Sequence, residues 1–214
     1  MIARRFTNGV VDVWWFACDQ DPGALAAALS PDEQAIAAKF VRPIHRTRYT
    51  AQHAMVRGLL ARYLGIAPAA VAFTRGSRGK PAVAGLEHNL SHTDDVALLA
   101  VSRSIAVGVD VERYAANIDP LELARTVLAP AEAACTERHA FFRIWCRKEA
   151  CLKATGDGLV DDLTSLSVIE DRVSVGGAVV YVQDLALDVD HAAALATLVP
   201  CAPIDPAPAE TFTS

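Results

Sequence analysis

Four charged residues in the second half of the chain have the types and spacing needed to bind a cation and a phosphate. Asp110 and Glu112 are separated by one residue in the run VGVDVERY, so in a strand both carboxylates point to one face. Glu149 and Lys153 are four apart in WCRKEACLKATGDGL, so in a helix they share a face. If this strand and helix pack together, three carboxylates and an ammonium group converge. A hard divalent cation, Mg²⁺ or Mn²⁺, is the expected neutraliser.

Helices and short strands must position these residues. Ser30, followed by Pro-Asp-Glu, predicts a helix that runs to about Phe40. Pro43 interrupts the pattern, and a second helix is predicted over 46–64 and closed by Gly65. The chain then turns to short strands, and strand-like runs return after the WCRKEACLKATGDGL segment. Helices packed on small antiparallel sheets predict an α+β fold.

A cationic cluster lies at the start of the second predicted helix. Basic side chains at a helix start are electrostatically unfavourable unless an anion is nearby. Phosphate binding is one interpretation, and a solvated helix face is the other. The cluster consists of Arg42, His45, Arg46 and Arg48, and Arg57 follows further along.

Polar residues also gather among the short strands in the first half of the chain. Lys80 lies in the turn SRGKP, before a proline that fixes the local backbone. Asn89, Ser91 and His92 fall within four residues, just before an apolar strand, where a loop can present them to a ligand. A lone histidine is more often structural, but Ser91 and Lys80 nearby favour a binding role here.

The net charge of −5 hides an asymmetry between the two halves. Residues 1–105 hold 12 Lys and Arg against 8 Asp and Glu, whereas residues 106–214 hold 8 against 17. A basic half facing an acidic half suits a polyanionic ligand that is also bound to a metal. The alternative is a chance difference between solvated helix faces.

Four motifs in one order carry a family resemblance. The segments GKP, NLSH, GVDVE and WCRKEACLKATGDGL, over about residues 30–170, resemble the 4'-phosphopantetheinyl transferases of the pseudo-dimeric, surfactin-synthetase type. The resemblance implies transfer of the phosphopantetheine arm of coenzyme A to a serine hydroxyl of an apo acyl or peptidyl carrier protein. Adenosine 3',5'-bisphosphate would be released.

The resemblance also implies roles for individual residues. Asp110, Glu112 and Glu149 would be Mg²⁺ ligands at the coenzyme A diphosphate, and Lys153 would neutralise charge as the phosphoryl group moves. Coenzyme A contacts are expected from Lys80, Ser91 and His92, with His92 near the 3'-phosphate, and from Arg46 and Arg57. The segment Glu33 to Ala38 departs from the family pattern because it offers no lysine for a phosphate, and His53 stands where many relatives have a basic residue.

The chemistry of the reaction points to a base. Attack by a serine on a diphosphate needs in-line geometry, charge neutralisation and removal of the hydroxyl proton. A carboxylate at the metal site is a better candidate than His92, which belongs to the other half of the chain. We therefore expect Glu149 to act as the base, directly or through a bound water.

The resemblance divides the chain into two similar subdomains related by a pseudo-two-fold axis. We expect an N-terminal subdomain over residues 1–104 with the coenzyme A phosphate contacts and a C-terminal subdomain over 105–200 with the metal site. The active cleft would lie between them. The proline-rich tail, residues 201–214, is expected to be disordered.

Two other function classes remain open. A metal-dependent phosphodiesterase or nuclease could use the same acids, but acidic overall charge and the lack of an aromatic-interleaved basic track argue against nucleic acid. A non-catalytic carrier-protein binding module would not need the acids. No apolar run reaches the length of a membrane span, so a cytoplasmic protein without membrane contact is expected. Because both halves of the site lie in one chain, a monomer is expected.

Overall fold

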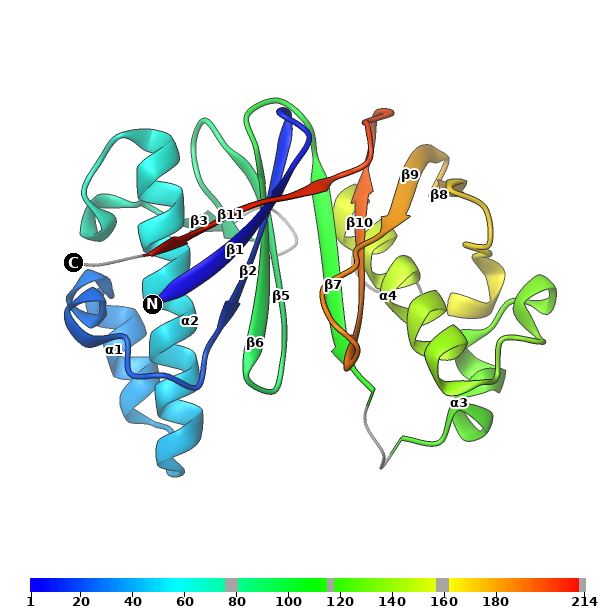
Figure 1. Ribbon diagram of the computed structural model, residues 1–214, viewed down its shortest axis with the longest axis horizontal. Coiled ribbons are helices and arrows are strands. Elements are labelled where there is room, and N and C mark those ends of the chain that lie inside the picture. The colour runs from blue at the N-terminus through cyan, green and yellow to red at the C-terminus, as the bar shows by residue number, and fades with distance from the viewer. Residues whose placement is uncertain (76–80, 115–117, 157–161, 212–214) are drawn as a thin grey trace.

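A computed structural model of the chain describes residues 1–75, 81–114, 118–156 and 162–211. Two antiparallel sheets lie next to each other in the middle of the molecule, with α2 on the outer side of one and α4 on the outer side of the other (Figure 1). The α+β prediction is confirmed. The strands are β1 (Ile2–Thr7), β2 (Val11–Ala17), β3 (Thr74–Arg75), β4 (Pro81–Ala82), β5 (Glu87–Thr93), β6 (Val96–Ser102), β7 (Val107–Arg113), β8 (Arg172–Val175), β9 (Ala178–Asp184), β10 (His191–Thr197) and β11 (Asp205–Thr211). The α-helices are α1 (Pro31–Ala38), α2 (Pro43–Leu64), α3 (Pro120–Val127) and α4 (Arg138–Thr155).

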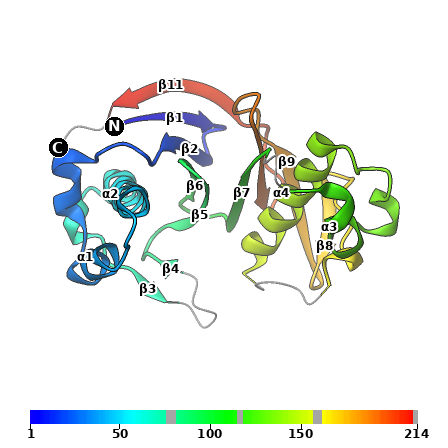
Figure 2. The same ribbon diagram turned by 90° about the horizontal axis from the view of Figure 1, so that it is seen from below.

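The first sheet has the strand order β11-β1-β2-β6-β5 and curves around α2 (Figure 2). Helix α1 begins with a capping box, in which the Ser30 hydroxyl accepts from the Glu33 amide at 3.3 Å and the Glu33 carboxylate accepts from the Ser30 amide at 2.7 Å. Helix α2 begins at Pro43, earlier than predicted. Proline stands at the first helical position, where its missing N–H costs nothing, so Pro43 starts the helix rather than interrupting it.

The second sheet has the order β7-β10-β9-β8 and packs on α4. The two halves of the chain share one connectivity. In the first, β2, α1, α2, β5 and β6 follow in sequence with strands ordered β2-β6-β5. In the second, β7, α3, α4, β9 and β10 follow in sequence with strands ordered β7-β10-β9. In each half, a long helix therefore packs against three strands that have the same spatial order relative to their sequence order.

Strands β5 and β7 belong to different sheets but lie side by side at the centre of the molecule (Figures 1 and 2). Side chains of β5 bridge the junction, since the Asn89 amide oxygen accepts from the Val109 backbone N–H at 2.9 Å. Behind the junction, Val107, Val109 and Val111 pack with residues of both sheets in one hydrophobic cluster. The alternate positions of β7 are left to face α4. The junction therefore holds the two halves in one fixed arrangement.

The expectation of a disordered tail over 201–214 is wrong for Asp205–Thr211, which form β11 and pair antiparallel with β1. β11 is an edge strand, and an edge is where a strand tolerates proline, because one row of its N–H groups has no partner to lose. The C-terminal segment thus returns to the first sheet, so it joins the first half in space. Within the described residues, no helix combines the length and the apolar character needed to cross a bilayer.

Candidate active site

Gly108 brings strand β7 unusually close to helix α4. A Cβ at this position would lie 2.1 Å from the Ala150 carbonyl oxygen and 2.4 Å from the Ala154 nitrogen, which no side chain can occupy. Because side chains alternate along a strand, Asp110 and Glu112 leave β7 on the same side as Gly108. The glycine of the GVDVE segment therefore allows the acids of β7 to approach the helix that carries Glu149 and Lys153.

Asp110 is the centre of a three-residue contact between the two halves. Its Oδ1 accepts from the Lys153 ammonium at 2.6 Å and from the Ser91 hydroxyl at 2.7 Å. Lys153 also donates to the Ser91 oxygen at 3.1 Å. The Asp110 side chain is 5% exposed and that of Lys153 29% exposed, so the ion pair lies at the inner end of an accessible site.

The other two carboxylates lie next to this contact and are half-buried. Glu112 accepts from the Thr93 hydroxyl at 3.1 Å. Burial, and then the Asp110 charge, raise the pKa of both Glu112 and Glu149. Glu149 raises the pKa of Glu112 as well, although it contributes less. The three acids are therefore close enough to interact electrostatically. We call Asp110, Glu112 and Glu149 the carboxylate cluster.

The carboxylate cluster is not gathered into a ready-made metal site. In the part of the chain that the structure describes, no three His, Cys, Asp or Glu side chains are close enough together to hold a metal ion. However, Asp110 Oδ2 is buried and has no hydrogen-bond partner among the described residues. A buried carboxylate oxygen without a donor is costly, and it is an acceptor that a cation can satisfy.

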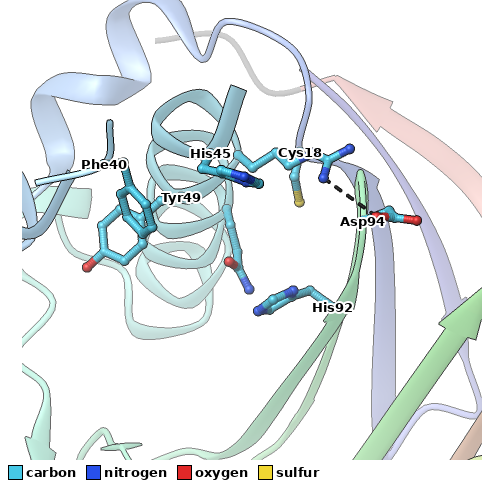
Figure 3. A pocket seen from close by; sticks show the side chains of 8 residues that line it. Cys18, Phe40, His45, Tyr49, His92 and Asp94 are labelled. Carbon is cyan, nitrogen blue, oxygen red and sulfur yellow. Dashed lines mark ion pairs between the residues drawn. The ribbon is translucent and has the colours of Figure 1, made fainter. Parts of the chain in front are cut away.

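A pocket of about 230 Å³ lies between α2 and β5, and we call it the His92 pocket. Figure 3 shows the His45 ring from α2 and the His92 ring from β5 turned toward the same space. Arg48 also lines it and pairs with Asp94 at 3.6 Å, drawn as the dashed line in Figure 3. Burial and the cations Lys153, His53 and Arg48 lower the pKa of His92. Because the Lys153 charge is close enough to lower the pKa of His92, the His92 pocket adjoins the carboxylate cluster.

A larger pocket of about 600 Å³ lies on the other side of Tyr49, which lines both pockets. Arg57 lines the larger pocket, but its guanidinium is committed to the protein. It donates to Glu33 at 2.7 Å and to the Val71 carbonyl at 2.9 Å, and it is 4% exposed. The wall of this pocket therefore combines a neutralised ion pair with aromatic and apolar surface.

The sequence of this chain is similar to known proteins of one family. Residues 106–196 match the family model described as the 4'-phosphopantetheinyl transferase superfamily. The chain is 40% identical to the 4'-phosphopantetheinyl transferase HetI of Nostoc sp. over 165 residues, which cover 70% of each chain. It is 34% identical to the 4'-phosphopantetheinyl transferase AcpT of Salmonella typhi, with 71% of this chain and 79% of that protein covered. A phosphopantetheinyl transferase of Thraustochytrium sp. is 31% identical, with 75% and 64% covered.

The chain belongs to the 4'-phosphopantetheinyl transferase family. The region that matches the family model contains the carboxylate cluster and Lys153, whereas Ser91 and His92 lie before it. In this family member, the residues outside the match are brought to the same site by the junction of β5 and β7.

The structure separates the predicted phosphate contacts of this transferase. His92 lines the His92 pocket, and Ser91 contacts Asp110 and Lys153. Arg46 is exposed and donates to the Phe40 carbonyl at 3.1 Å, and it does not line that pocket. Arg57 is held by Glu33. Lys80 lies outside the described residues.

Two basic residues of the pocket were not predicted individually as coenzyme A contacts. Arg48 and His45 belong to the cationic cluster, but only the phase of α2 decides which of its members face β5. A helix that starts at Pro43 sets that phase. The bridging residues Asn89 and Thr93 were also missed as partners of β7. Their alternation with Ser91 along one strand was the available signal.

Proposed function

We propose that this chain transfers the 4'-phosphopantetheine arm of coenzyme A to a serine hydroxyl of an apo acyl or peptidyl carrier protein, with release of adenosine 3',5'-bisphosphate. Membership of the family supports the reaction class. The observation that carries the proposal for this chain is the contact of Lys153, Ser91 and Asp110, with the His92 pocket beside it. It joins acids suited to a metal with cations suited to phosphates.

The carboxylate cluster is the proposed site for Mg²⁺, with Mn²⁺ as an alternative. Three carboxylates are the oxygen ligands that these hard cations prefer, and the unpartnered Asp110 Oδ2 offers one of them. Glu112 and Glu149 would have to turn toward this oxygen, because they do not yet surround a common point. When bound, the ion would supply charge neutralisation at the coenzyme A diphosphate and stabilise the leaving group.

Glu149 is the proposed base. In the transfer, the carrier serine oxygen forms a bond to the phosphorus that bears the pantetheine arm, and the bond from this phosphorus to the bridging oxygen breaks. The bridging oxygen leaves with adenosine 3',5'-bisphosphate, and the serine proton passes to Glu149. Burial and Asp110 raise the pKa of Glu149, which makes it a better proton acceptor than an exposed glutamate.

The cations of the site have a separate role in the proposal. Lys153 would neutralise the diphosphate, since its ammonium is partly exposed and lies at the carboxylate cluster. His92 would contact the 3'-phosphate, and Arg48 and His45 line the same pocket. Arg48 supplies a positive charge there, and His92 and His45 offer ring nitrogens, whereas Glu33 to Ala38 offers no lysine.

The chain would be of the surfactin-synthetase, pseudo-dimeric type and act as a monomer. The repeated connectivity of the two halves supports this subfamily. Ser91 from one half and Asp110 from the other meet within one chain, so a second copy is not needed to complete the site.

Incubation with coenzyme A, Mg²⁺ and a panel of apo carrier proteins, followed by intact-mass measurement, tests the function. A mass gain equal to the phosphopantetheine arm on at least one carrier is expected, and none on the same carrier with its serine replaced by alanine. Glu149→Gln is expected to reduce the rate at least about 100-fold. Arg143→Gln, an exposed site on the same helix, should leave it unchanged.

Three other outcomes would redirect the assignment. Near-normal rates for Glu149→Gln with excess Mg²⁺ would remove Glu149 as the base. Hydrolysis of a nucleic acid without any carrier would favour a phosphodiesterase. Carrier binding without a mass gain across the panel would favour a non-catalytic binding module.

A further inference from the structure

Lys153 occupies the position at Asp110 that a cation would otherwise fill. Its ammonium lies 2.6 Å from Oδ1, and Ser91 holds both partners through hydrogen bonds. The opposite oxygen, Oδ2, is buried, and no residue within the described ranges donates a hydrogen bond to it. One oxygen of Asp110 is therefore satisfied by the protein itself, and the other is left for a ligand from outside.

The charges of the site make this ammonium important in the protein without ligands. Asp110 is almost fully buried, Glu112 leaves β7 on the same side as Asp110, and Glu149 shares a face of α4 with Lys153. A buried carboxylate among like charges is strongly unfavourable unless a cation pairs with it. Lys153 is the only cation that makes a direct ion pair with the cluster among the described residues.

We propose that Lys153 is the built-in counter-cation of the carboxylate cluster and that it opposes divalent-metal binding until a diphosphate arrives. This inference rests on the proposed function for the identity of the ligands. In the free protein the ammonium neutralises Asp110. When a metal and a diphosphate enter together, the phosphate oxygens accept the ammonium, and the carboxylate cluster is released to the metal.

Two physical consequences follow. A divalent ion that binds alone must sit beside the Lys153 ammonium, and this repulsion weakens its affinity. A diphosphate removes the repulsion because it pairs with both cations. Each ligand therefore tightens the binding of the other by the same factor, as linkage requires. Metal and coenzyme A should bind as a coupled pair rather than independently.

Mn²⁺ is the probe for the test, with free Mn²⁺ measured by electron paramagnetic resonance on the full chain. We compare the original protein with Lys153→Met, each with and without coenzyme A. Without coenzyme A, Lys153→Met is expected to bind Mn²⁺ about tenfold more tightly, the factor for a nearby unit charge in a water-like dielectric. Coenzyme A should tighten Mn²⁺ binding strongly in the original protein and less in the variant.

Control variants separate this effect from a general change in charge or folding. Arg143→Gln removes a positive charge from the same helix away from the site, and its Mn²⁺ affinity should not change. Lys153→Arg keeps the charge and should bind Mn²⁺ weakly, as the original protein does. If Lys153→Met unfolds without metal, recovery of its circular dichroism signal by Mn²⁺ at lower concentrations than the original protein needs for binding supports the inference.

Equal or weaker Mn²⁺ binding by Lys153→Met overturns the inference, as does unfolding that Mn²⁺ does not reverse. The proposed function is tested independently by carrier modification. If no carrier gains mass but Mn²⁺ binding behaves as expected, the function is wrong and the role of Lys153 stands. If carriers are modified but Lys153→Met shows no gain in Mn²⁺ affinity, the function stands and this inference is wrong.

Discussion

Helices α2 and α4 both carry many cations, but they use them differently. On α4, Arg147 and Lys148 are 1% and 0% exposed, and both side chains bind partners within the protein. Lys148 pairs with the fully buried Glu132 at 2.6 Å, and Arg147 donates to the Val168 carbonyl at 2.8 Å. On α2, Arg57 likewise pairs with Glu33 inside the protein, whereas His45 and Arg48 line the His92 pocket.

The difference indicates a division of labour between the halves. The buried cations of α4 fix the helix against surrounding loops, so that Glu149 and Lys153 are held at the carboxylate cluster. The first turns of α2 instead leave cations at a partly open pocket, where a phosphate can replace protein partners such as Asp94. The half that carries the carboxylate cluster is therefore predicted to be rigid, and the half that carries most of the His92 pocket to be adaptable.

The largest expected effect tests the close packing of β7 on α4. Gly108→Ala should prevent stable folding or cost about 3 kcal/mol or more in the free energy of unfolding, because the added Cβ meets backbone atoms that cannot move separately. Urea denaturation measures the effect. The matched variant is Gly58→Ala on α2, where no atom of the described residues outside the adjacent backbone of that helix lies within 4 Å of the added Cβ.

Gly58→Ala should stabilise the protein by about 0.5–1 kcal/mol, since alanine is the better residue inside a helix. If both variants lost stability equally, the contrast between the two packing sites would be wrong.

The next effect tests the buried ion pair of α4. Lys148→Met should cost about 3–5 kcal/mol in the free energy of unfolding, because it leaves Glu132 buried without its cation. Arg57→Met on α2 should cost less, about 1–3 kcal/mol, because Glu33 keeps His53 and the Ser30 amide as partners.

Both variants can be compared in one series of urea titrations. The double variant Glu132→Gln/Lys148→Met should recover part of the loss, because it removes the orphaned charge. No recovery in the double variant would show that Lys148 acts through packing rather than through its ion pair.

Local patterns predicted the parts of the site that depend on one element. Strand alternation placed Asp110 and Glu112 on one face, and the four-residue spacing placed Glu149 and Lys153 on one face. The helix start at Ser30 and the stop at Gly65 were also confirmed. These features depend on neighbours along the chain, so the sequence contains the information needed to predict them.

Contacts between distant segments could not be predicted in this way. Lys148 lies next to Glu149 in the sequence but pairs with the buried Glu132, which comes from a preceding turn that no spacing connects to it. The pairing of Ser91 with Asp110 depends on two sheets meeting edge to edge. Pro206 suggested disorder, whereas an edge position accommodates it.

A smaller effect separates two arginines of α2. Arg48→Gln should raise KM for coenzyme A about tenfold or more, because Arg48 lines the His92 pocket and a charged hydrogen bond to phosphate is worth about 1.5–3 kcal/mol. Arg46→Gln should change KM by less than about twofold, because Arg46 is exposed and bonded to a backbone carbonyl outside the pocket. Initial rates with saturating carrier protein measure both values, and the reverse ranking would contradict the assignment of the pocket.

The smallest expected effect is the pH dependence that His92 gives to coenzyme A binding. Burial and neighbouring cations hold the pKa of His92 below its usual value in the free protein, so its ring is neutral near pH 7. A bound phosphate would raise this pKa, and the complex would take up a proton. The affinity should therefore increase as the pH falls from 8 toward 6, by about two- to tenfold through this residue.

Isothermal titration calorimetry on the original protein and on His92→Gln isolates this contribution. The titration of coenzyme A itself and of His45 and His53 is common to both proteins, so it cancels in the difference between them. The same shift has a second consequence for the free protein. Because the folded-state pKa of His92 is depressed, its neutral ring contributes stability that is present above pH 6.5 and is lost as the pH falls. A His92→Gln variant should therefore lose less stability on acidification. An identical pH dependence of coenzyme A affinity in the two proteins would remove His92 from the proposed phosphate contacts.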